Sequence, residues 1–230
     1  MWSIIHPLVL WASYVFIFQY CLHAKLAPGA LTTSYPLHLF IGMLPWFLFS
    51  DTVMRAASSI VDHANLITKT MFPSEILPVS IFLSSLASHV VVTVIAVAVA
   101  CVVQQNVNPA LALLPLWMLI IGLFSVGVGW IAASLQVYLR DTAQLVVVAM
   151  TFWFWLTPIF IQEEKFPVWA PWILRLNPMA YVVRAYRMML LGRAAPPFHD
   201  LAIALGFAVA AFVLGGLFFR HMKKGFADVL

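Results

Sequence analysis

The residue types that catalyse reactions are few in this sequence, and their spacing does not suit catalysis. The seven histidines never fall four residues apart, so the spacing of a helical metal site is missing. The phosphate-binding pattern GxxxxGK[ST] and the nucleophile pattern GxSxG are also absent. The eight acidic residues stand between apolar runs or at their ends. The only ionisable side chains deep within a run are those of His6 and His89. A packing contact between helices is a simpler role for these two than a proton relay. The sequence therefore indicates a protein that changes no bond itself.

One long polar stretch, residues 58–78, could instead bind a partner. Its apolar positions Leu66, Ile67 and Met71 have the spacing of one helix face, which predicts a short amphipathic helix. Phe72 and Pro73 end this helix, and Pro78 begins the next one, because proline suits a first helical turn but not a helix interior. A helix of this kind lies at a membrane surface. There it can dock a soluble partner or rest on lipid headgroups.

The elements that must position this stretch are membrane-spanning helices. The chain has 230 residues, of which 64% are hydrophobic and 9% charged. Its mean hydropathy is +1.01. A soluble domain carries about a quarter charged residues. Long continuous apolar runs predict an all-α integral membrane protein and not a β-barrel. The basic residues are scattered in loops, so the net charge of +4 does not indicate nucleic-acid binding.

Six apolar runs are predicted to span the membrane within a single transmembrane domain that covers residues 1–230. In chain order the predicted elements are a span at 2–22, a span at 35–53, the surface helix at 58–73, spans at 76–103, 110–137 and 142–161, an external segment at 162–200, and a span at 201–219. Within the external segment, residues 169–176 and 179–191 predict short helices that are re-entrant or interfacial. Gly127 and Gly129 predict close helix contact in the fourth span.

Six spans place both termini on the same side of the membrane. Each side would carry six of the twelve basic residues, so the positive-inside rule does not decide the orientation when the whole chain is counted. Without the segment 162–200 the division becomes six against one. That division favours cytoplasmic termini and a cytoplasmic position for residues 58–78 and for the charged turn at Arg140 and Asp141.

Four stretches, in order, carry a resemblance to a known family. They are Asn65-Leu66-Ile67 with Lys69 and the run Phe72-Pro73-Ser74-Glu75-Ile76-Leu77-Pro78; Tyr138-Leu139-Arg140-Asp141; Thr157-Pro158; and Asn177-Pro178-Met179 with Tyr186-Arg187 and Leu190-Leu191-Gly192. Together they resemble the membrane subunits of ABC transporters of the type-2 export class. The resemblance is strongest to permeases that export O-antigen, capsule or teichoic-acid polysaccharide.

The resemblance implies a partner ATPase and a coupling helix between the second and third spans. The coupling residues would be Asp62, Asn65, Leu66, Ile67, Lys69, Met71, Phe72 and Pro73. Arg140 and Asp141 would form a second cytoplasmic contact, or a simple helix-capping turn. Two copies of this chain would assemble with two ATPase subunits. The ATPase would bind ATP and magnesium, so no cofactor is expected in this chain.

The resemblance also implies that the first and fifth helices line a channel. Aromatic rings can stack on the apolar faces of sugars, so a sliding polymer could contact Trp11, Tyr14, Phe18, Phe152, Trp153, Trp155 and Phe160. These rings could equally pack between helices or lie in the interfacial belt. The external helices would form a gate, where Arg184 and Arg187 would meet phosphate, acidic sugar or anionic lipid.

These expectations describe an inner-membrane permease for an undecaprenyl-linked polysaccharide. The family has a basic amphipathic helix before its first span, where it forms a lipid-side gate, whereas here the apolar run begins at Trp2. Either the sequence is truncated, its start site is a late one, or this gate is missing. A type-2 exporter of a small drug-like molecule or lipid is the alternative within the class. A membrane-embedded enzyme would need clustered acids, histidines or arginines, which the sequence lacks. An assembly subunit would bind an ATPase without transport.

Overall fold

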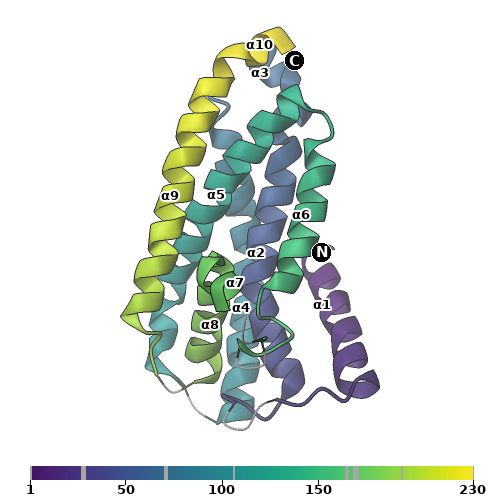
Figure 1. Ribbon diagram of the computed structural model, residues 1–230, viewed down its shortest axis with the longest axis vertical. Helices are drawn as coiled ribbons and strands as arrows, with labels where there is room; N and C mark the ends of the chain where they lie inside the picture. Colours follow the sequence, from purple (N-terminus) through teal and green to yellow (C-terminus); the bar gives the residue numbers. More distant parts are fainter. Residues whose placement is uncertain are drawn as a thin grey trace. The chain divides into compact units, whose positions relative to one another are not determined.

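The computed structural model describes residues 2–26, 30–69, 72–105, 107–163, 166–167, 171–192 and 194–229, without the side chains of residues 2–4, 6, 68–69 and 227–228. Within these ranges all regular structure is helical (Figure 1). The helices are α1 (Trp2–Val15), which continues as a π-helix (Phe16–Cys21), α2 (Tyr35–Asp62), α3 (Ala64–Lys69), α4 (Ile76–Gln104), a 3-10 helix (Pro109–Leu113), α5 (Leu114–Tyr138), α6 (Thr142–Leu156), α7 (Pro171–Leu176), α8 (Pro178–Leu191), α9 (Phe198–Met222), a 3-10 turn (Lys223–Gly225) and α10 (Phe226–Val229).

The prediction of an all-helical membrane protein is confirmed. Among the described residues, four helical stretches are long and apolar enough to cross a bilayer: Tyr35–Asp62, Ile76–Gln104, Pro109–Tyr138 and Phe198–Gly225. The shorter apolar helices Pro7–Cys21 and Thr142–Leu156 fall at the other two predicted spans. The short helices predicted at 169–176 and 179–191 correspond to α7 and α8.

The second long helix extends further than its sequence predicted. We expected a span to residue 53 and a separate surface helix from residue 58, but α2 continues without a break to Asp62. Residues 54–62 contain no glycine or proline, and Met, Arg and Ala favour helix, so nothing ends the helix earlier. The break falls at His63, and only the six residues of α3 form a separate short helix.

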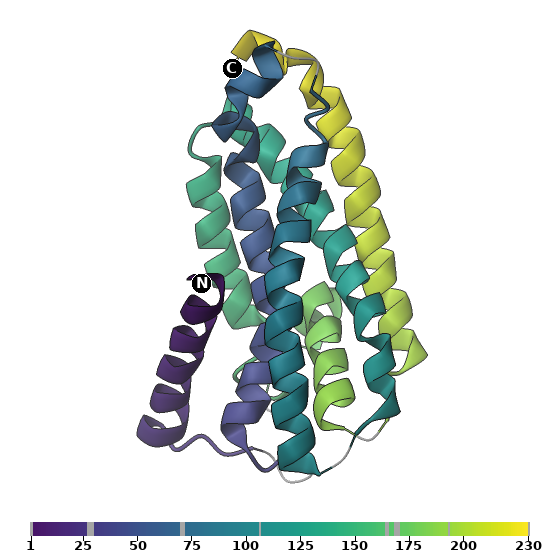
Figure 2. The ribbon, with the colours of Figure 1, turned by 180° about the vertical axis from the view of Figure 1, so that it is seen from behind.

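The chain forms two compact units, each made of three segments. Unit 1 comprises Met1–Phe47, Ala87–Met118 and Phe154–Ala204, and unit 2 comprises Leu48–Leu86, Leu119–Trp153 and Leu205–Leu230. In unit 1 the short helix α8 is almost fully buried, with Met179, Val183 and Tyr186 at 0% exposure. It lies beside the second half of α4 in both views (Figures 1 and 2), where the Tyr186 hydroxyl and His89 Nε2 are 3.1 Å apart.

Unit 2 contains a close crossing of α5 and α9. A Cβ atom added at Gly127 would overlap the backbone of Ala211, and one added at Gly215 would overlap the backbone of Gly127. At Gly129 an added Cβ would lie 3.0 Å from the Cβ of Ala56. Glycine permits these approaches because it has no side chain, as in other closely packed membrane helices. The predicted close contact of this helix through Gly127 and Gly129 is confirmed.

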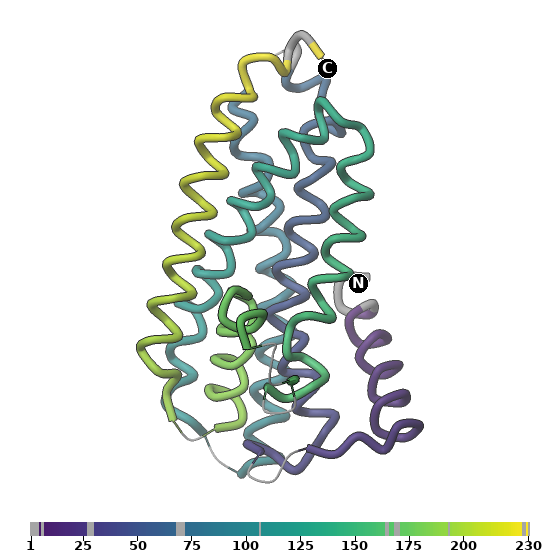
Figure 3. The backbone as a smooth tube through the Cα atoms, viewed as in Figure 1, coloured from purple at the N-terminus to yellow at the C-terminus, as the bar shows by residue number. Residues whose placement is uncertain are grey.

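The end of α6 exposes backbone carbonyl groups that are satisfied by side chains from α2, α8 and the residue before α8. Arg187 donates to the carbonyl oxygens of Pro158 at 2.7 Å and Ile159 at 2.6 Å. Asn177 Nδ2 donates to the Thr157 hydroxyl at 3.0 Å. The Tyr35 hydroxyl donates to the Phe160 carbonyl at 3.4 Å. Figure 3 follows the backbone through this turn at the lower end of α6. These contacts fix the turn within unit 1.

Unit 2 also holds the C-terminal part of the chain. Lys223 Nζ lies 2.8 Å from both carboxylate oxygens of Glu75, which precedes α4. The Tyr138 hydroxyl donates to the Met222 carbonyl at 2.8 Å. Phe226 of α10 is 1% exposed and packs against the rings of Phe219 and Tyr138. The end of α9 is therefore tied both to the start of α4 and to the end of α5.

We predict that Arg187→Met lowers the free energy of unfolding by about 2–4 kcal/mol, because it leaves two buried carbonyl oxygens without donors. Arg187→Lys should lose less, since the ammonium can still donate to one of them. Arg175→Met, which changes an exposed arginine of α7, should stay within about 0.5 kcal/mol of wild type. Unfolding in detergent measures all three. Equal stability of Arg187→Met and wild type would contradict the role of these hydrogen bonds.

We predict a pH-dependent contribution from the pair of Glu75 and Lys223. Burial raises the pKa of Glu75, but the hydrogen bond to Lys223, a backbone hydrogen bond and the charges of Lys223 and Arg220 together outweigh burial, and the pKa lies below its ordinary value of 4.5. The pair therefore stabilises the fold above pH 4.5, and this stabilisation is lost as the pH falls through the lower, folded-state pKa. Because both side chains are more than a third exposed, the contribution is about 0.5 kcal/mol.

Unfolding of wild type and Glu75→Gln at pH 7 and at pH values below 4.5 measures this contribution. We expect a small difference between them at pH 7 that shrinks in acid and in 1 M salt, since salt screens exposed charges. A difference that grows as the pH falls would overturn the assignment.

Candidate functional site

The predicted coupling residues surround α3, in unit 2. Asp62 is exposed at the end of α2, Asn65 is exposed on α3, and Leu66 is 37% exposed despite its apolar side chain. Ile67 and Phe72 are half-buried, and Pro73 is exposed. The side chain of Lys69 and the whole of Met71 lie outside the described residues. In both views α3, α10 and the turn between α5 and α6 lie at the same end of unit 2 (Figures 1 and 2). This end presents both polar and apolar side chains to a possible partner.

The turn between α5 and α6 carries the predicted second contact. Arg140 and Asp141 are both exposed, and neither side chain forms a hydrogen bond or ion pair with another described residue. The turn is held by Gln136 instead. Its Nε2 donates to the Arg140 carbonyl at 2.7 Å, and its Oε1 accepts from the Ala143 backbone N–H at 2.5 Å. Sequence reasoning missed Gln136, because a glutamine four residues before a turn has no distinctive spacing.

A further polar contact joins α2 and α4 in unit 2. The Ser85 hydroxyl donates to Asp51 at 2.6 Å, and Arg55 lies 3.3 Å from both Asp51 and Ser85. The sequence placed Asp51 near the end of a span, whereas in the structure α2 continues eleven residues beyond it to Asp62. The contact is half-exposed and neutralises the two charges against each other.

Four of the seven aromatic residues proposed to line a channel form one cluster in unit 1. The Phe160 ring lies 4.8 Å from the centroids of both Tyr14 and Phe18 and 4.9 Å from that of Trp155. Phe154, which the sequence analysis did not single out, completes the cluster at 5.1 Å from Phe160. Phe160 itself is 7% exposed, but Trp155 is 53% exposed and presents most of its indole at the surface. The cluster thus joins α1 to the end of α6 and leaves Trp155 available.

The other three proposed aromatic residues lie elsewhere. Trp11 packs edge-on against Phe40, and its indole N–H donates to the Pro36 carbonyl at 2.9 Å. In unit 2, Trp153 contacts the rings of Phe49 and Phe124 at 5.2 Å and 6.0 Å, which is packing between helices. Phe152 is 67% exposed. The sequence spacing alone did not separate the packed rings from the accessible ones.

The two arginines proposed for the external gate have different environments. Arg184 forms ion pairs with Glu163 at 2.5 Å and with Asp200, in the first turn of α9, at 2.9 Å. Burial lowers the pKa of Arg184, but the two carboxylates raise it more, and the pKa lies above its ordinary value. Arg187 is only 7% exposed and is bonded to the turn after α6. Both cations therefore hold α8 to neighbouring segments of unit 1.

These arrangements allow binding and mechanical contact. Within the described ranges, no three His, Cys, Asp or Glu side chains lie together as a metal site would need. The His89 and Tyr186 side chains are buried, and His89 Nε2 lies within hydrogen-bond distance of the Tyr186 and Thr93 hydroxyls. What the described residues offer is a mixed polar and apolar surface at one end of unit 2, and a partly exposed aromatic cluster in unit 1.

Comparison with known proteins gives a consistent result over the whole chain. The family model of ABC-2 type transporters matches residues 1–191. The chain is 26% identical to the O-antigen export system permease protein RfbA of Myxococcus xanthus, over 99% of this chain and 86% of that protein. It is 27% identical to the RfbA protein of the same description from Klebsiella pneumoniae, over 100% of this chain and 86% of that protein. This chain belongs to the family of ABC-2 type transporters.

Proposed function

We propose that this chain is the membrane-spanning permease subunit of an ABC exporter that moves lipid-linked polysaccharide out of the cytoplasm. The observation that carries the proposal is its similarity, over nearly its full length, to proteins described as O-antigen export permeases. A separate ATPase subunit would bind ATP and magnesium and supply the energy.

In this proposal the chain is one transmembrane domain with six spans. They are α1 with its π-helical end, α2, α4, α5, α6 and α9, while α7 and α8 do not cross. Six spans bring both termini, α3 and the turn between α5 and α6 to the cytoplasmic side of the inner membrane. Arg187 is buried and Arg184 is paired with two carboxylates. Both observations support omitting the arginines of α8 when basic residues are counted for the positive-inside rule.

The cytoplasmic end of unit 2 would receive the ATPase. Asn65, Leu66 and Ile67 on α3 would enter a cleft of that subunit, and Arg140 with Asp141 would add a second contact. The turn does not need these two side chains for its own geometry, because Gln136 holds it. Movement of the ATPase would then be transmitted through α3 to α2. The contact of Asp51, Arg55 and Ser85 would pass it from α2 to α4.

Two copies of the chain would form the channel, with α1 and α6 facing it. Of the clustered aromatic residues, Trp155 is the one with the area to contact a polymer. Weak, repeated contacts with the apolar faces of sugars suit a sliding chain better than one deep site. At the external mouth, α7 and α8 would form the gate. Arg184 and Arg187 would hold its position through their bonds to Glu163, Asp200 and the turn after α6.

We predict that Leu66→Asp weakens the complex with the partner ATPase by about tenfold or more, because it places an uncompensated charge in a desolvated contact. Co-purification of the chain with a co-expressed ABC ATPase subunit from the same organism, in nanodiscs, measures the effect. Phe198→Asp is the matched control, since Phe198 is also an exposed apolar residue but lies at the start of α9, on the external side of the proposed topology. It should co-purify as wild type does. A wild-type chain that retains no ATPase would overturn the proposed function.

We predict different defects for substitutions of Trp153 and Trp155, which lie two residues apart on α6. Trp155→Ala should slow export about threefold to tenfold, as expected for the loss of an aromatic contact, and should lower stability less than Trp153→Ala because about half of its side chain is exposed. Trp153→Ala should lower the free energy of unfolding by about 2 kcal/mol, because its ring packs against Phe49 and Phe124. Surface polysaccharide in cells and unfolding in detergent measure the two effects. Identical behaviour of both variants would contradict the assignment of Trp155 to substrate contact.

A further inference from the structure

The last long helix, α9, is fixed by an ion pair at each end. It runs without a break from Phe198 to Met222 and contains no proline (Figure 1). At about 1.5 Å per residue it is about 37 Å long, which is enough to cross a bilayer. Its first residues belong to unit 1 and the remainder to unit 2. A displacement of one end along the helix axis therefore reaches the other end through the helix itself.

The end of α9 at Met222 is bound to the segment that follows α3. Lys223 Nζ donates to both carboxylate oxygens of Glu75 at 2.8 Å. Glu75 stands two residues after Pro73, the last of the predicted coupling residues, and directly before α4. The Glu75 carbonyl accepts from the Trp130 indole N–H at 3.0 Å, so α5 is bound to the same residue. Glu75 thus joins the coupling segment to both α5 and α9.

The helices α5 and α9 are packed closely enough to act as one body. At Gly127 and Gly215 their backbones meet without side chains between them. The centroid of the Trp130 ring lies 4.8 Å from that of Phe212 on α9. The indole contact and the ion pair of the coupling segment therefore both act on this packed pair of helices.

The other end of α9 is bound to α8. Asp200, in the first turn of α9, is 2% exposed, and its two carboxylate oxygens accept from Arg184 Nη1 at 3.0 Å and 2.9 Å. Arg184 also donates to Glu163, which follows α6. Because a buried carboxylate is costly without its cation, α8 and α9 should stay joined when one of them moves. An axial movement of α9 would therefore move α8.

We propose that α9 carries the movement of the coupling segment to the external gate. Its attachment points are the ion pair of Glu75 with Lys223 and the ion pair of Arg184 with Asp200. The inference rests on the proposed function, which places α3 at the ATPase and α8 at the gate. These side chains are positioning residues, since they act through α3 and α8. The last span thereby gains a part in transport that is separate from the channel-lining role of α1 and α6.

The pair of Glu75 and Lys223 allows a sharp test because it contributes little to the stability of the fold. Both side chains are more than a third exposed, so water screens their attraction. Breaking the pair should leave folding almost intact, whereas a role in transmission predicts a clear loss of gate movement. Unfolding and gate movement, measured on the same variants, thus separate a positioning contact from a merely structural one.

The experiment follows the gate of the full chain in its complex with the ATPase, in nanodiscs. A spin label is attached through Arg175→Cys, an exposed position on α7, in a chain that also carries Cys21→Ala and Cys101→Ala. Double electron–electron resonance measures the distance between the labels of the two copies, without nucleotide and with a non-hydrolysable ATP analogue. ATP hydrolysis and unfolding in detergent are measured for every variant.

We expect the analogue to change this distance in the labelled chain. Lys223→Glu should lower the ratio of open to closed gates by about threefold to tenfold, the range of effects for a contact between coupled elements. Lys223→Arg should respond as the labelled chain does, and Glu75→Lys combined with Lys223→Glu should restore the response to within about twofold. Asp200→Asn weakens the other attachment and should reduce the response as well, while ATP hydrolysis continues.

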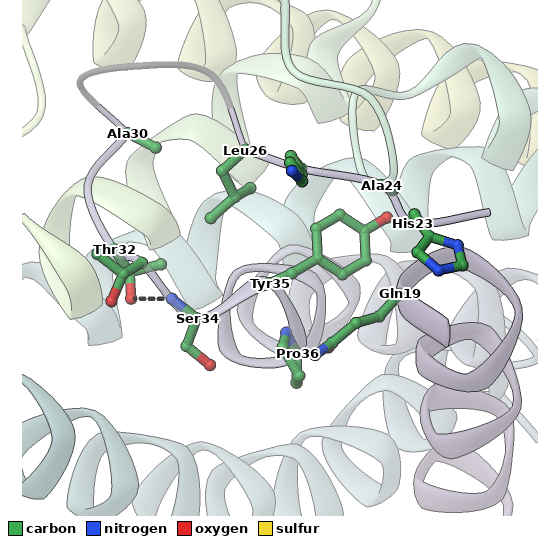
Figure 4. A pocket seen from close by; sticks show the side chains of 11 residues that line it. Gln19, His23, Ala24, Leu26, Ala30, Thr32, Ser34, Tyr35 and Pro36 are labelled. Carbon is green, nitrogen blue, oxygen red and sulfur yellow. Dashed lines mark hydrogen bonds between the residues drawn. The ribbon is translucent and has the colours of Figure 1, made fainter. Parts of the chain in front are cut away.

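Two control variants should respond fully. Lys224→Glu is matched to Lys223→Glu, because it reverses a neighbouring exposed charge. Thr32→Ala removes the hydrogen bond that the Thr32 hydroxyl oxygen accepts from the Ser34 backbone N–H at 3.2 Å, in the wall of a cavity in unit 1 (Figure 4). That contact involves no residue of α9.

A full response in Lys223→Glu, an equal loss in Lys224→Glu, or no change of distance in the labelled chain would overturn the inference. If the labelled chain binds the ATPase and exports polymer while Lys223→Glu opens its gate normally, the role of α9 fails and the proposed function stands. A labelled chain that neither binds the ATPase nor exports polymer, like an unlabelled one, would remove the proposed function and this inference together.

Discussion

The fold of unit 1 depends on satisfying the backbone carbonyl groups where α6 ends. In a hydrocarbon environment an unsatisfied carbonyl is costly, so a helix that stops short needs donors from elsewhere. Tyr35, Asn177 and Arg187 supply them, from the start of α2, the N-cap position of α8 and the middle of α8. The same contacts hold α8 in place and bring Phe160 to Tyr14 and Phe18. One requirement of the backbone thus organises both α8 and the aromatic cluster.

In unit 2, side chains connect the ends of different helices. Glu75, Trp130 and Lys223 join the start of α4 to α5 and α9, and Gln136 holds the turn that follows α5. The glycines of the α5 and α9 crossing remove side chains where the two helices meet. The contacts of Gln136 hold the turn without using the side chains of Arg140 and Asp141. In the proposed function, a stiff frame of this kind would pass force from the turn into the helices.

The sequence predicted the apolar helices and the short helices after residue 162, because length and hydropathy decide both. It also drew attention to Thr157-Pro158, Asn177 and Arg187 separately, and the structure brings these residues into one contact. Their meeting could not be predicted, since their partners lie 20 or more residues away. For the same reason the burial of Arg187, the pairing of Glu75 with Lys223 and the role of Gln136 were not predicted. The end of α2 was placed too early, because residues 58–62 were assigned to a separate surface helix although no residue at 54–57 breaks the preceding one.

Deletion of the gene tests most directly our proposal that this chain conducts polysaccharide across a membrane. The measurement is the amount of polymer at the cell surface and of lipid-linked polymer inside the cell, with and without a copy of the gene supplied in trans. We expect the surface polymer to disappear while lipid-linked polymer accumulates inside, and both effects to reverse when the copy is supplied. Unchanged surface polysaccharide in the deletion strain, or loss of polymer with no internal accumulation, would contradict the account.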